Sequence, residues 1–357
     1  MLHVHRSRIL AALCLAGVSV LTVASLVLAA PAGATDEEFA PLDRPGPTLT
    51  VPSSDLAASL KCSGDLATGT LEPVLLNPAT GVTPDQNYSW NYERAFTAQG
   101  RPWCAVTMPH HTLGDIQTAG EYLVHAIRTM HALAGRRIAV MGHSQGGMSM
   151  RWALRFWPDT RAMVDDVIGM AGSNHGTTAL KQCVVGRTTC PPAVWQQGRD
   201  ARFILALNSG AETFAGISYT EVFTHTDEVV QPNSTDAMSS SALHTGAGQI
   251  TNVSTQDVCP LDPYEHLTVG TIDPVTYALV MDALGYAGPA DPTRISRRAC
   301  LQLYQPGVDP LNVSTYLQVL AAAPGLLAVN LPDVNVVGVP EVPAEPPLRC
   351  YTSAAGC

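Results

Sequence analysis

The segment "GHSQG" at 142–146 constrains the fold more than any other part of the chain, because it matches G-x-S-x-G between a predicted strand and a predicted helix. The apolar run at 136–142 predicts a buried strand, and residues 145–158 predict a helix that ends at a proline. In such a sharp turn the serine takes a strained backbone conformation, and side chains in place of the flanking glycines would collide with the neighbouring strand and helix. The turn raises the hydroxyl of Ser144 above the sheet and aims helix N–H groups at the same point. The segment therefore predicts a nucleophilic serine.

Strands alternate with helices along most of the chain. Short apolar runs predict buried strands, and apolar residues at three-to-four spacing predict helices. Asp273 followed by Pro274 indicates a helix start, since these residues suit the N-cap and the first helical position. This alternation predicts an α/β fold with a mostly parallel sheet that helices cover on both faces. The predicted strands lie at 72–78, 102–109, 136–142, 165–172, 219–225 and 249–255, and the predicted helices at 114–135, 145–158 and 273–285.

The N-terminal segment has the pattern of a secretory signal peptide. Arg6 and Arg8 precede an unbroken apolar run at 9–29, and small residues at 32–34 suit cleavage. The alternative is a membrane anchor, because the apolar run is long, but no later segment is apolar enough to span a bilayer. We therefore expect residues 1–34 to be removed and the protein to be secreted without a stable membrane anchor.

The rest of the chain is expected to form one domain with two appendages. Residues 35–59 are rich in proline, aspartate and threonine, which is typical of an extended N-terminal arm. Residues 60–300 contain the alternating strands and helices of the catalytic domain. A C-terminal extension at 301–357 holds a predicted helix at 310–323 and a cysteine-tied arm, and we expect both to pack on the same domain.

The net charge of the chain indicates which classes of binding partner are unfavourable. The chain is 46% hydrophobic and only 14% charged, and removal of residues 1–34 leaves 18 basic residues against 30 acidic ones, a net charge of −12. An acidic surface favours solubility and argues against nucleic acid as a partner. We expect a monomer.

The cysteine count predicts disulfides. Nine cysteines are present, and eight remain once the signal peptide is removed. An even number in an exported chain indicates four disulfides. The alternative is a zinc site, but the chain has no CxxC pair and no histidine at ligand spacing from a cysteine. We expect no metal and no organic cofactor.

The serine needs a histidine base and an acid that orients this base. In this kind of fold the acid follows the serine along the chain, and the histidine follows the acid. This order excludes His143, and adjacent residues in a sharp turn also point apart. The acid is expected after a late strand, and both Asp227 and Glu228 follow the strand at 219–225. The residues alone leave these two acids open.

Two histidines follow the candidate acids. His244 lies in a serine- and glycine-rich loop before the strand at 249–255. His266 lies after that strand and before a helix, which is the usual place of the base. We therefore favour His266 over His244.

From about Leu60 to the C-terminus the chain resembles the α/β-hydrolase lipases of the Candida antarctica lipase B type and their bacterial relatives. Several segments carry the resemblance besides the serine turn: "LKCSG", "RPWCAV", "PVLLNPATGVT", "RFWPDTR", "AVWQQ", "HTDEVVQP" and "QDVCPLDPYEHLTVG". The resemblance implies an α/β-hydrolase fold, and a triad of Ser144, Asp227 and His266 in which the first acid of "HTDEVVQP" is the triad member. It also implies an oxyanion hole formed by Thr80 and the backbone N–H of Gln145.

The resemblance implies three disulfide pairs, and the two remaining cysteines are then expected to pair with each other. The implied pairs are Cys62–Cys104, Cys259–Cys300 and Cys350–Cys357, and the remaining pair is Cys183–Cys190. This last bridge encloses the segment where the yeast lipase has a short mobile lid. We expect the bridge to restrain the lid, so that activation by an oil–water interface is weak.

Some positions depart from the yeast lipase. His143 stands where that lipase has a tryptophan that lines its alcohol pocket, Ala79 replaces a glycine, and Ser173 lies in a loop that looks more like bacterial lipases. The helix at 310–323 and the segment 324–332 are expected to cap an acyl channel, with ordinary core packing as the alternative. The expected pocket residues are His143, Ser173, Gln197, Val229, Leu326 and Leu327.

Taken together, these features predict a secreted carboxylic ester hydrolase of the triacylglycerol lipase type that works through a serine acyl-enzyme. Its substrate would be a lipid or other ester, reached in part at an oil–water interface. One alternative is an esterase or polyesterase that acts on short-chain or polymeric esters, because the triad would be the same and only the pocket would differ. Another is a non-catalytic binding protein on a hydrolase fold.

Overall fold

The computed structural model of the chain describes residues 38–308 and 339–357. The predicted signal peptide at 1–34, the predicted helix at 310–323, and Leu326 and Leu327 lie outside these described residues. Among the described residues, no helix has both the length and the apolar character needed to cross a bilayer.

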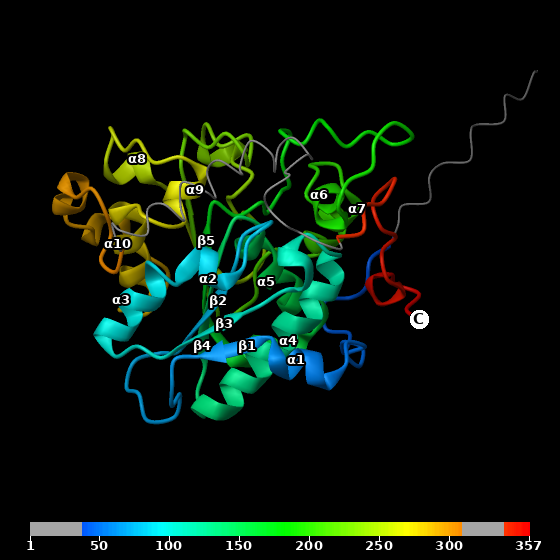
Figure 1. Cartoon of the computed structure of the whole chain (residues 1–357), viewed down its shortest axis with the longest axis horizontal. Helices are drawn as coiled ribbons and strands as arrows, with labels where there is room; N and C mark the ends of the chain where they lie inside the picture. The colour runs from blue at the N-terminus through cyan, green and yellow to red at the C-terminus, as the bar shows by residue number, and fades with distance from the viewer. Residues whose placement is uncertain (1–37, 309–338) are drawn as a thin grey trace, which may run out of the picture. The chain divides into compact units, whose positions relative to one another are not determined.

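A seven-stranded sheet runs through the centre of the fold (Figure 1). Its strand order is β1-β3-β2-β4-β5-β6-β7. Strand β1 runs antiparallel to β3, and all other neighbouring pairs are parallel. The predicted mostly parallel sheet is therefore confirmed. The strands are β1 (Leu60–Cys62), β2 (Val74–Asn77), β3 (Trp103–Val106), β4 (Ile138–His143), β5 (Val164–Met170), β6 (Ser218–Phe223) and β7 (Gln249–Ser254).

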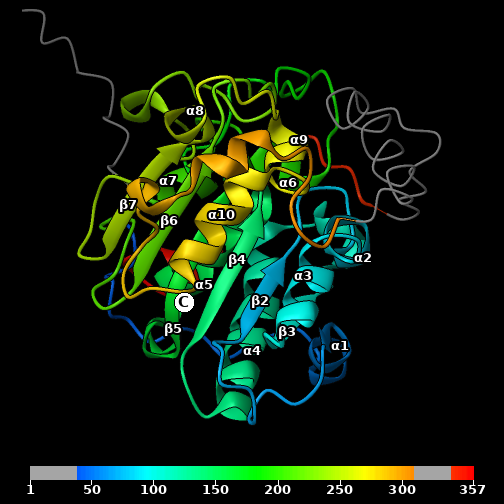
Figure 2. The same cartoon turned by 90° about the vertical axis from the view of Figure 1, so that its left-hand side faces the viewer.

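Helices cover both faces of the sheet, and alternate strand residues point to each face. Leu75 and Val140 belong to the core cluster that includes α4 (Ile116–Ala134) and α5 (Gln145–Phe156). Val74 and Met141 belong to a second cluster, together with residues of α3 (Tyr92–Gln99) and α10 (Pro274–Ala283). Figure 2 shows α10 in front of the sheet and α4 and α5 behind it. Because both faces are buried, the central strands β2 and β4 are buried along their whole length, whereas the edge strands β1 and β7 are partly exposed.

The shorter helices lie mainly in the loops that follow the strands. They are α1 (Ser53–Ala58), α2 (Pro84–Tyr88), α6 (Pro192–Gln196), α7 (Arg202–Leu207), α8 (Thr255–Val258) and α9 (His266–Val269). Residues 38–308 and 339–357 also contain six 3₁₀ turns: η1 (Pro109–Thr112), η2 (Pro158–Met163), η3 (Asp236–Met238), η4 (Pro292–Arg294), η5 (Arg297–Leu301) and η7 (Cys350–Thr352).

Side-chain caps set the N-terminal ends of two of the predicted helices, α4 and α10. Asp273 accepts hydrogen bonds from the N–H groups of Val275 and Thr276, and Pro274 is the first residue of α10, as predicted. The helix predicted at 114–135 begins at Ile116, because the side chain of Asp115 accepts from Gln117 N and caps it.

The N-terminal arm is not extended throughout, which corrects the expectation for 35–59. Residues near its end form the short helix α1. This helix places the side chain of Leu56 in the hydrophobic core. The start of the arm meets the C-terminal tail, where Phe39 pairs with Ser353 and Ala40 N donates to Thr352 O. All four expected disulfides are present: Cys62–Cys104, Cys183–Cys190, Cys259–Cys300 and Cys350–Cys357.

Candidate active site

Ser144 occupies a strained turn between β4 and α5. Its φ is 54° and its ψ is −123°, a conformation that L-residues rarely adopt. A Cβ added at Gly142 would lie 2.3 Å from the backbone of Gly146, and one added at Gly146 would lie 2.2 Å from the carbonyl oxygen of Asn77. The two glycines are therefore needed for steric reasons, as the sequence predicts.

The structure brings Ser144, His266 and Asp227 together into one hydrogen-bonded chain. His266 Nε2 lies 2.9 Å from Ser144 Oγ, and His266 Nδ1 lies 2.8 Å from Asp227 Oδ2. All three residues are buried. Asp227 is held by the N–H groups of Val229 and Val230, which donate to its Oδ1 across 2.9 and 2.7 Å.

A local capping box sets the position of His266. Glu265 is the N-cap of α9, and its side chain accepts from Leu267 N across 2.7 Å. Thr268 Oγ1 in turn accepts from Glu265 N across 2.8 Å. His266 is the first residue of α9. The reciprocal hydrogen bonds of Glu265 and Thr268 on either side of it fix the backbone of this first turn.

The charges around His266 favour its protonated form. Burial lowers the pKa of His266. The charge of Asp227 and its hydrogen bond raise this pKa, and the charges of Glu228 and Glu265 add to the rise. The net effect is a pKa above the usual value for histidine. Glu228, the other candidate acid, reaches only the backbone N–H of His266, at 3.5 Å. The exposed His244 instead contacts the ring of His175, with centroids 5.8 Å apart.

Thr80 and Gln145 lie beside Ser144, as expected of oxyanion-hole residues. Gln145 is the first residue of α5, so its backbone N–H has no acceptor within the helix. Thr80 Oγ1 donates to Gln145 Oε1 across 2.8 Å. Gln197 Nε2 lies 3.0 Å from Thr80 Oγ1 and 3.1 Å from Gln145 Oε1, so one side-chain amide contacts both residues.

Ser144 and His266 open onto a cavity of about 70 Å³ with mainly apolar walls. Of the pocket residues expected from the sequence, Gln197 and Val229 line this cavity. The full lining is Ala79, Thr80, Ser144, Thr177, Leu180, Val194, Gln197, Val229, Val230, His266 and Leu267.

Two expected pocket residues do not line this cavity, which corrects the sequence-based expectation. His143 is 1% exposed, and its ring bonds the backbone of His266 behind the reacting atoms. Ser173 is completely buried and donates to Gln197 Oε1 across 3.0 Å, so it lies behind the wall that Gln197 forms.

Several cavity residues were not predicted from the sequence, although some signals were present. Val194 lies in the same segment "AVWQQ" as the predicted Gln197, and Val230 and Leu267 directly follow predicted residues. Thr177 and Leu180 come from a loop after β5, and only the folded chain brings this loop to the serine.

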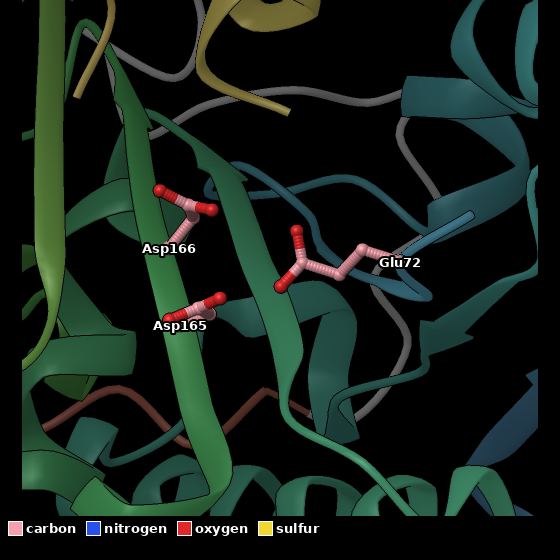
Figure 3. A group of neighbouring side chains, drawn as sticks. All are labelled: Glu72, Asp165 and Asp166. Atoms are coloured by element: carbon pink, nitrogen blue, oxygen red, sulfur yellow. The ribbon is translucent and has the colours of Figure 1, made fainter. Parts of the chain in front are cut away.

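At the opposite end of the sheet, Glu72, Asp165 and Asp166 form an acidic cluster (Figure 3). Glu72 precedes β2, and its side chain points toward the start of β5, which carries the two aspartates (Figure 3). Burial, followed by the charges of Asp166 and Asp165, raises the pKa of Glu72 to about 8. Arg137 pairs with Asp165 across 2.8 Å. One oxygen of Glu72, Oε1, is buried without a hydrogen-bond partner among the described residues.

Comparison with known proteins supports a lipase B relationship. No family model matches the chain. Lipase B of Pseudozyma antarctica is 33% identical over 223 residues, which cover 62% of this chain and 64% of that lipase. The match thus spans less than two thirds of that enzyme's length. The crystal structure of Aspergillus fumigatus lipase B superposes with a TM-score of 0.75 at 28% identity and covers 87% of this chain and 74% of that one.

Proposed function

We propose that this chain, an α/β-hydrolase of the lipase B type, hydrolyses carboxylic esters through an acyl-enzyme. One observation carries the proposal. The hydrogen-bonded chain from Asp227 through His266 to Ser144 ends at an apolar cavity, beside the N–H of Gln145.

In the first half of the reaction, Ser144 Oγ attacks the ester carbonyl while His266 Nε2 takes its proton. Asp227 holds the ring so that Nε2 faces the serine, and its charge stabilises the imidazolium that forms. The N–H of Gln145 donates to the oxyanion, and the hydroxyl of Thr80 does so once it rotates away from Gln145 Oε1. His266 then gives its proton to the leaving alcohol, and the acyl group stays on Ser144.

Water completes the reaction by the same steps in reverse order. His266 accepts a proton from water, the hydroxide attacks the acyl carbonyl, and Ser144 leaves with the proton that His266 returns. An alcohol in place of water would give transesterification.

For the substrate, we propose acylglycerols. Leu180, Val194, Val229, Val230 and Leu267 give the cavity an apolar wall suited to a fatty acyl chain. One observation favours the alternative of short-chain esters: the cavity measures only about 70 Å³, which is small for a ligand pocket. A profile of kcat/KM against acyl length, measured with p-nitrophenyl esters, separates the two substrates.

The central test is Ser144→Ala. We expect the variant to fold like the wild type and to lose ester cleavage, while the wild type incorporates one phosphonate per chain on Ser144. A variant that keeps full activity would refute the mechanism. A wild type that cleaves no ester would favour the non-catalytic binding protein instead.

Export is a further part of this proposal. The signal-like sequence at 1–34 and the four disulfides support secretion, since disulfides persist in oxidising compartments. N-terminal sequencing of the protein from the culture medium should show a chain that begins at residue 35. We also propose a monomer that acts at an oil–water interface, without nucleic acid.

A further inference from the structure

His143 directly precedes Ser144 in the chain, but its side chain is directed at the base. It is the last residue of β4 and is 1% exposed. His143 Nε2 lies 2.9 Å from the backbone carbonyl oxygen of His266. The two rings have centroids 5.4 Å apart. This buried hydrogen bond joins the nucleophile turn to the loop of the base, in addition to the contact between Ser144 Oγ and His266 Nε2.

The fold leaves room for this contact at Gly270. Gly270 is the C-cap of α9, the helix that begins with His266. A Cβ at this position would lie 2.2 Å from Cδ2 of His143, so any other residue would push the ring away. The imidazole thus packs directly against the backbone of α9.

The chemistry of the contact defines the tautomer of His143. A carbonyl oxygen only accepts, so Nε2 carries the proton, and in the neutral ring Nδ1 is then an acceptor. Burial, followed by the nearby charge of His266, lowers the pKa of His143 to about 3. His143 therefore remains a neutral donor while His266 gains and loses its proton.

The other side of the ring faces the oxyanion loop through Asn87. Asn87 Nδ2 lies 3.5 Å from His143 Nδ1, a long contact, and Asn87 Oδ1 accepts from Ala79 N across 2.9 Å. Ala79 precedes Thr80. Asn87 itself is buried, and its backbone carbonyl accepts from Asn91 Nδ2 across 2.9 Å.

We propose that His143 is a positioning residue that holds the backbone of His266 against the turn of Ser144 and, through Asn87, also supports the oxyanion loop. The inference rests on the proposed ester hydrolysis. Ser144 with Gln145, the base His266, and Thr80 come from three separate segments of the chain. His143 directly precedes Ser144. A donor at this position therefore restrains the distance between Ser144 Oγ and His266 Nε2.

The test compares His143→Phe, which removes both ring nitrogens, with His143→Gln, which keeps an N–H donor of similar reach. For His143→Phe we expect kcat per titrated serine to fall about 10- to 100-fold, as for a small misplacement of reacting groups, with KM little changed. His143→Gln should recover most of this loss. His125→Phe, the same exchange on α4, is the matched control and should behave like the wild type.

The pH profile separates positioning from simple stabilisation. Asp227, Glu228 and Glu265 are the charged groups that act on His266, and Asp227 has the largest effect. If His266 shifts, its bond to Asp227 weakens, so the acid limb of kcat/KM should move to lower pH in His143→Phe and return in His143→Gln. The proposal would be overturned if His143→Phe had the kcat of the wild type and the same acid limb of kcat/KM. It would also be overturned if the variant had a lower Tm but unchanged kinetics.

A proton NMR titration of His266 gives a readout that needs no ester cleavage. The Nδ1 proton shared with Asp227 should titrate at lower pH in His143→Phe than in the wild type. If the wild type cleaves no ester but this shift occurs, the proposed function fails and the positioning role stands. If the His266 titration is the same in both proteins, the positioning role fails.

Discussion

The side-chain amide of Gln197 donates a hydrogen bond to the hydroxyl of Thr80 across 3.0 Å. The same hydroxyl donates to Gln145 Oε1. A threonine hydroxyl carries one proton, so in this structure that proton points to Gln145 Oε1, and the hydroxyl has to rotate before it can donate to an oxyanion.

Removal of the Thr80 hydroxyl should reduce turnover more than binding. For Thr80→Val we expect kcat to fall about 10²- to 10³-fold, the usual loss for one oxyanion donor, with KM within a few-fold of the wild type. Steady-state kinetics on p-nitrophenyl butyrate measures both constants. Thr107→Val, at an exposed threonine outside the cavity, is the control. Equal kcat in Thr80→Val and the control would show that the hydroxyl does not bind the oxyanion.

Activity should fall in acid as His266 becomes protonated. Because the net effect of its surroundings raises the pKa of His266 above 6.5, kcat/KM should already decline as the pH falls toward that value. Asp227→Asn removes the charge that raises this pKa, so the acid limb should move to lower pH. At its pH optimum this variant should retain about 10⁻⁴ of the wild-type kcat. An acid limb that stays in place would mean that another group controls it.

The Cys183–Cys190 bridge should limit interfacial activation. Leu180, just before the bridged loop, lines the cavity, and Cys190 pairs with Val342 of the C-terminal arm. The wild type should show no sharp rise in rate as a substrate passes its solubility limit. The double variant Cys183→Ser/Cys190→Ser should show such a rise.

The Cys350–Cys357 bridge provides a matched control, because both bridges have a sequence separation of 7. The chain-entropy model gives a loss of about 2.5 kcal/mol for opening either loop. Both double variants should therefore lose similar stability, and only the first should gain interfacial activation. A sharp rise in the wild type would contradict the restrained lid.

Stability should fall as the pH rises from about 4.5 to about 8, in part because of Glu72. Burial and the aspartates raise the folded-state pKa of Glu72 to about 8, against an unfolded value of 4.5. In that window the unfolded chain ionises Glu72 and the folded chain does not, so unfolding becomes more favourable and then levels off above pH 8. Asp166, with a pKa raised to about 7 by burial and by Asp165, acts in the same direction.

Glu72→Gln should flatten this decline, since the amide is neutral at every pH. Below pH 4.5 we expect the variant to be about 1 kcal/mol less stable than the wild type, because the amide replaces a carboxyl hydrogen-bonded to Asp166. This difference should shrink or reverse by pH 8. Asp200→Asn, at an exposed aspartate, is the control. Parallel Tm curves for Glu72→Gln and the wild type would contradict the raised pKa.

Local patterns in the sequence were sufficient for strands β2 to β7, for helices α4, α5 and α10, and for the nucleophile, but not for β1 or the shorter helices. Apolar runs predict the strand before Ser144 and the helix after it. Gly142 and Gly146 predict the sharp turn between them, and the structure shows that a side chain at either position would collide with neighbouring backbone. Chain order alone was sufficient to favour His266 over His244, because this fold places the base after the last strand. The choice of Asp227 over Glu228 came from family resemblance, and the structure shows that only Asp227 reaches the ring.

The sequence by itself determined the candidate nucleophile and base and the order in which the chain presents them, since strand, turn and helix signals are local. Only the tertiary structure decided where His143 and Ser173 point and which loops enclose the cavity. His143 was expected in the pocket because it adjoins Ser144, yet it turns to the carbonyl of His266, where Gly270 leaves space for its ring. A side chain's direction depends on partners from distant segments, and their approach is a property of the packed fold.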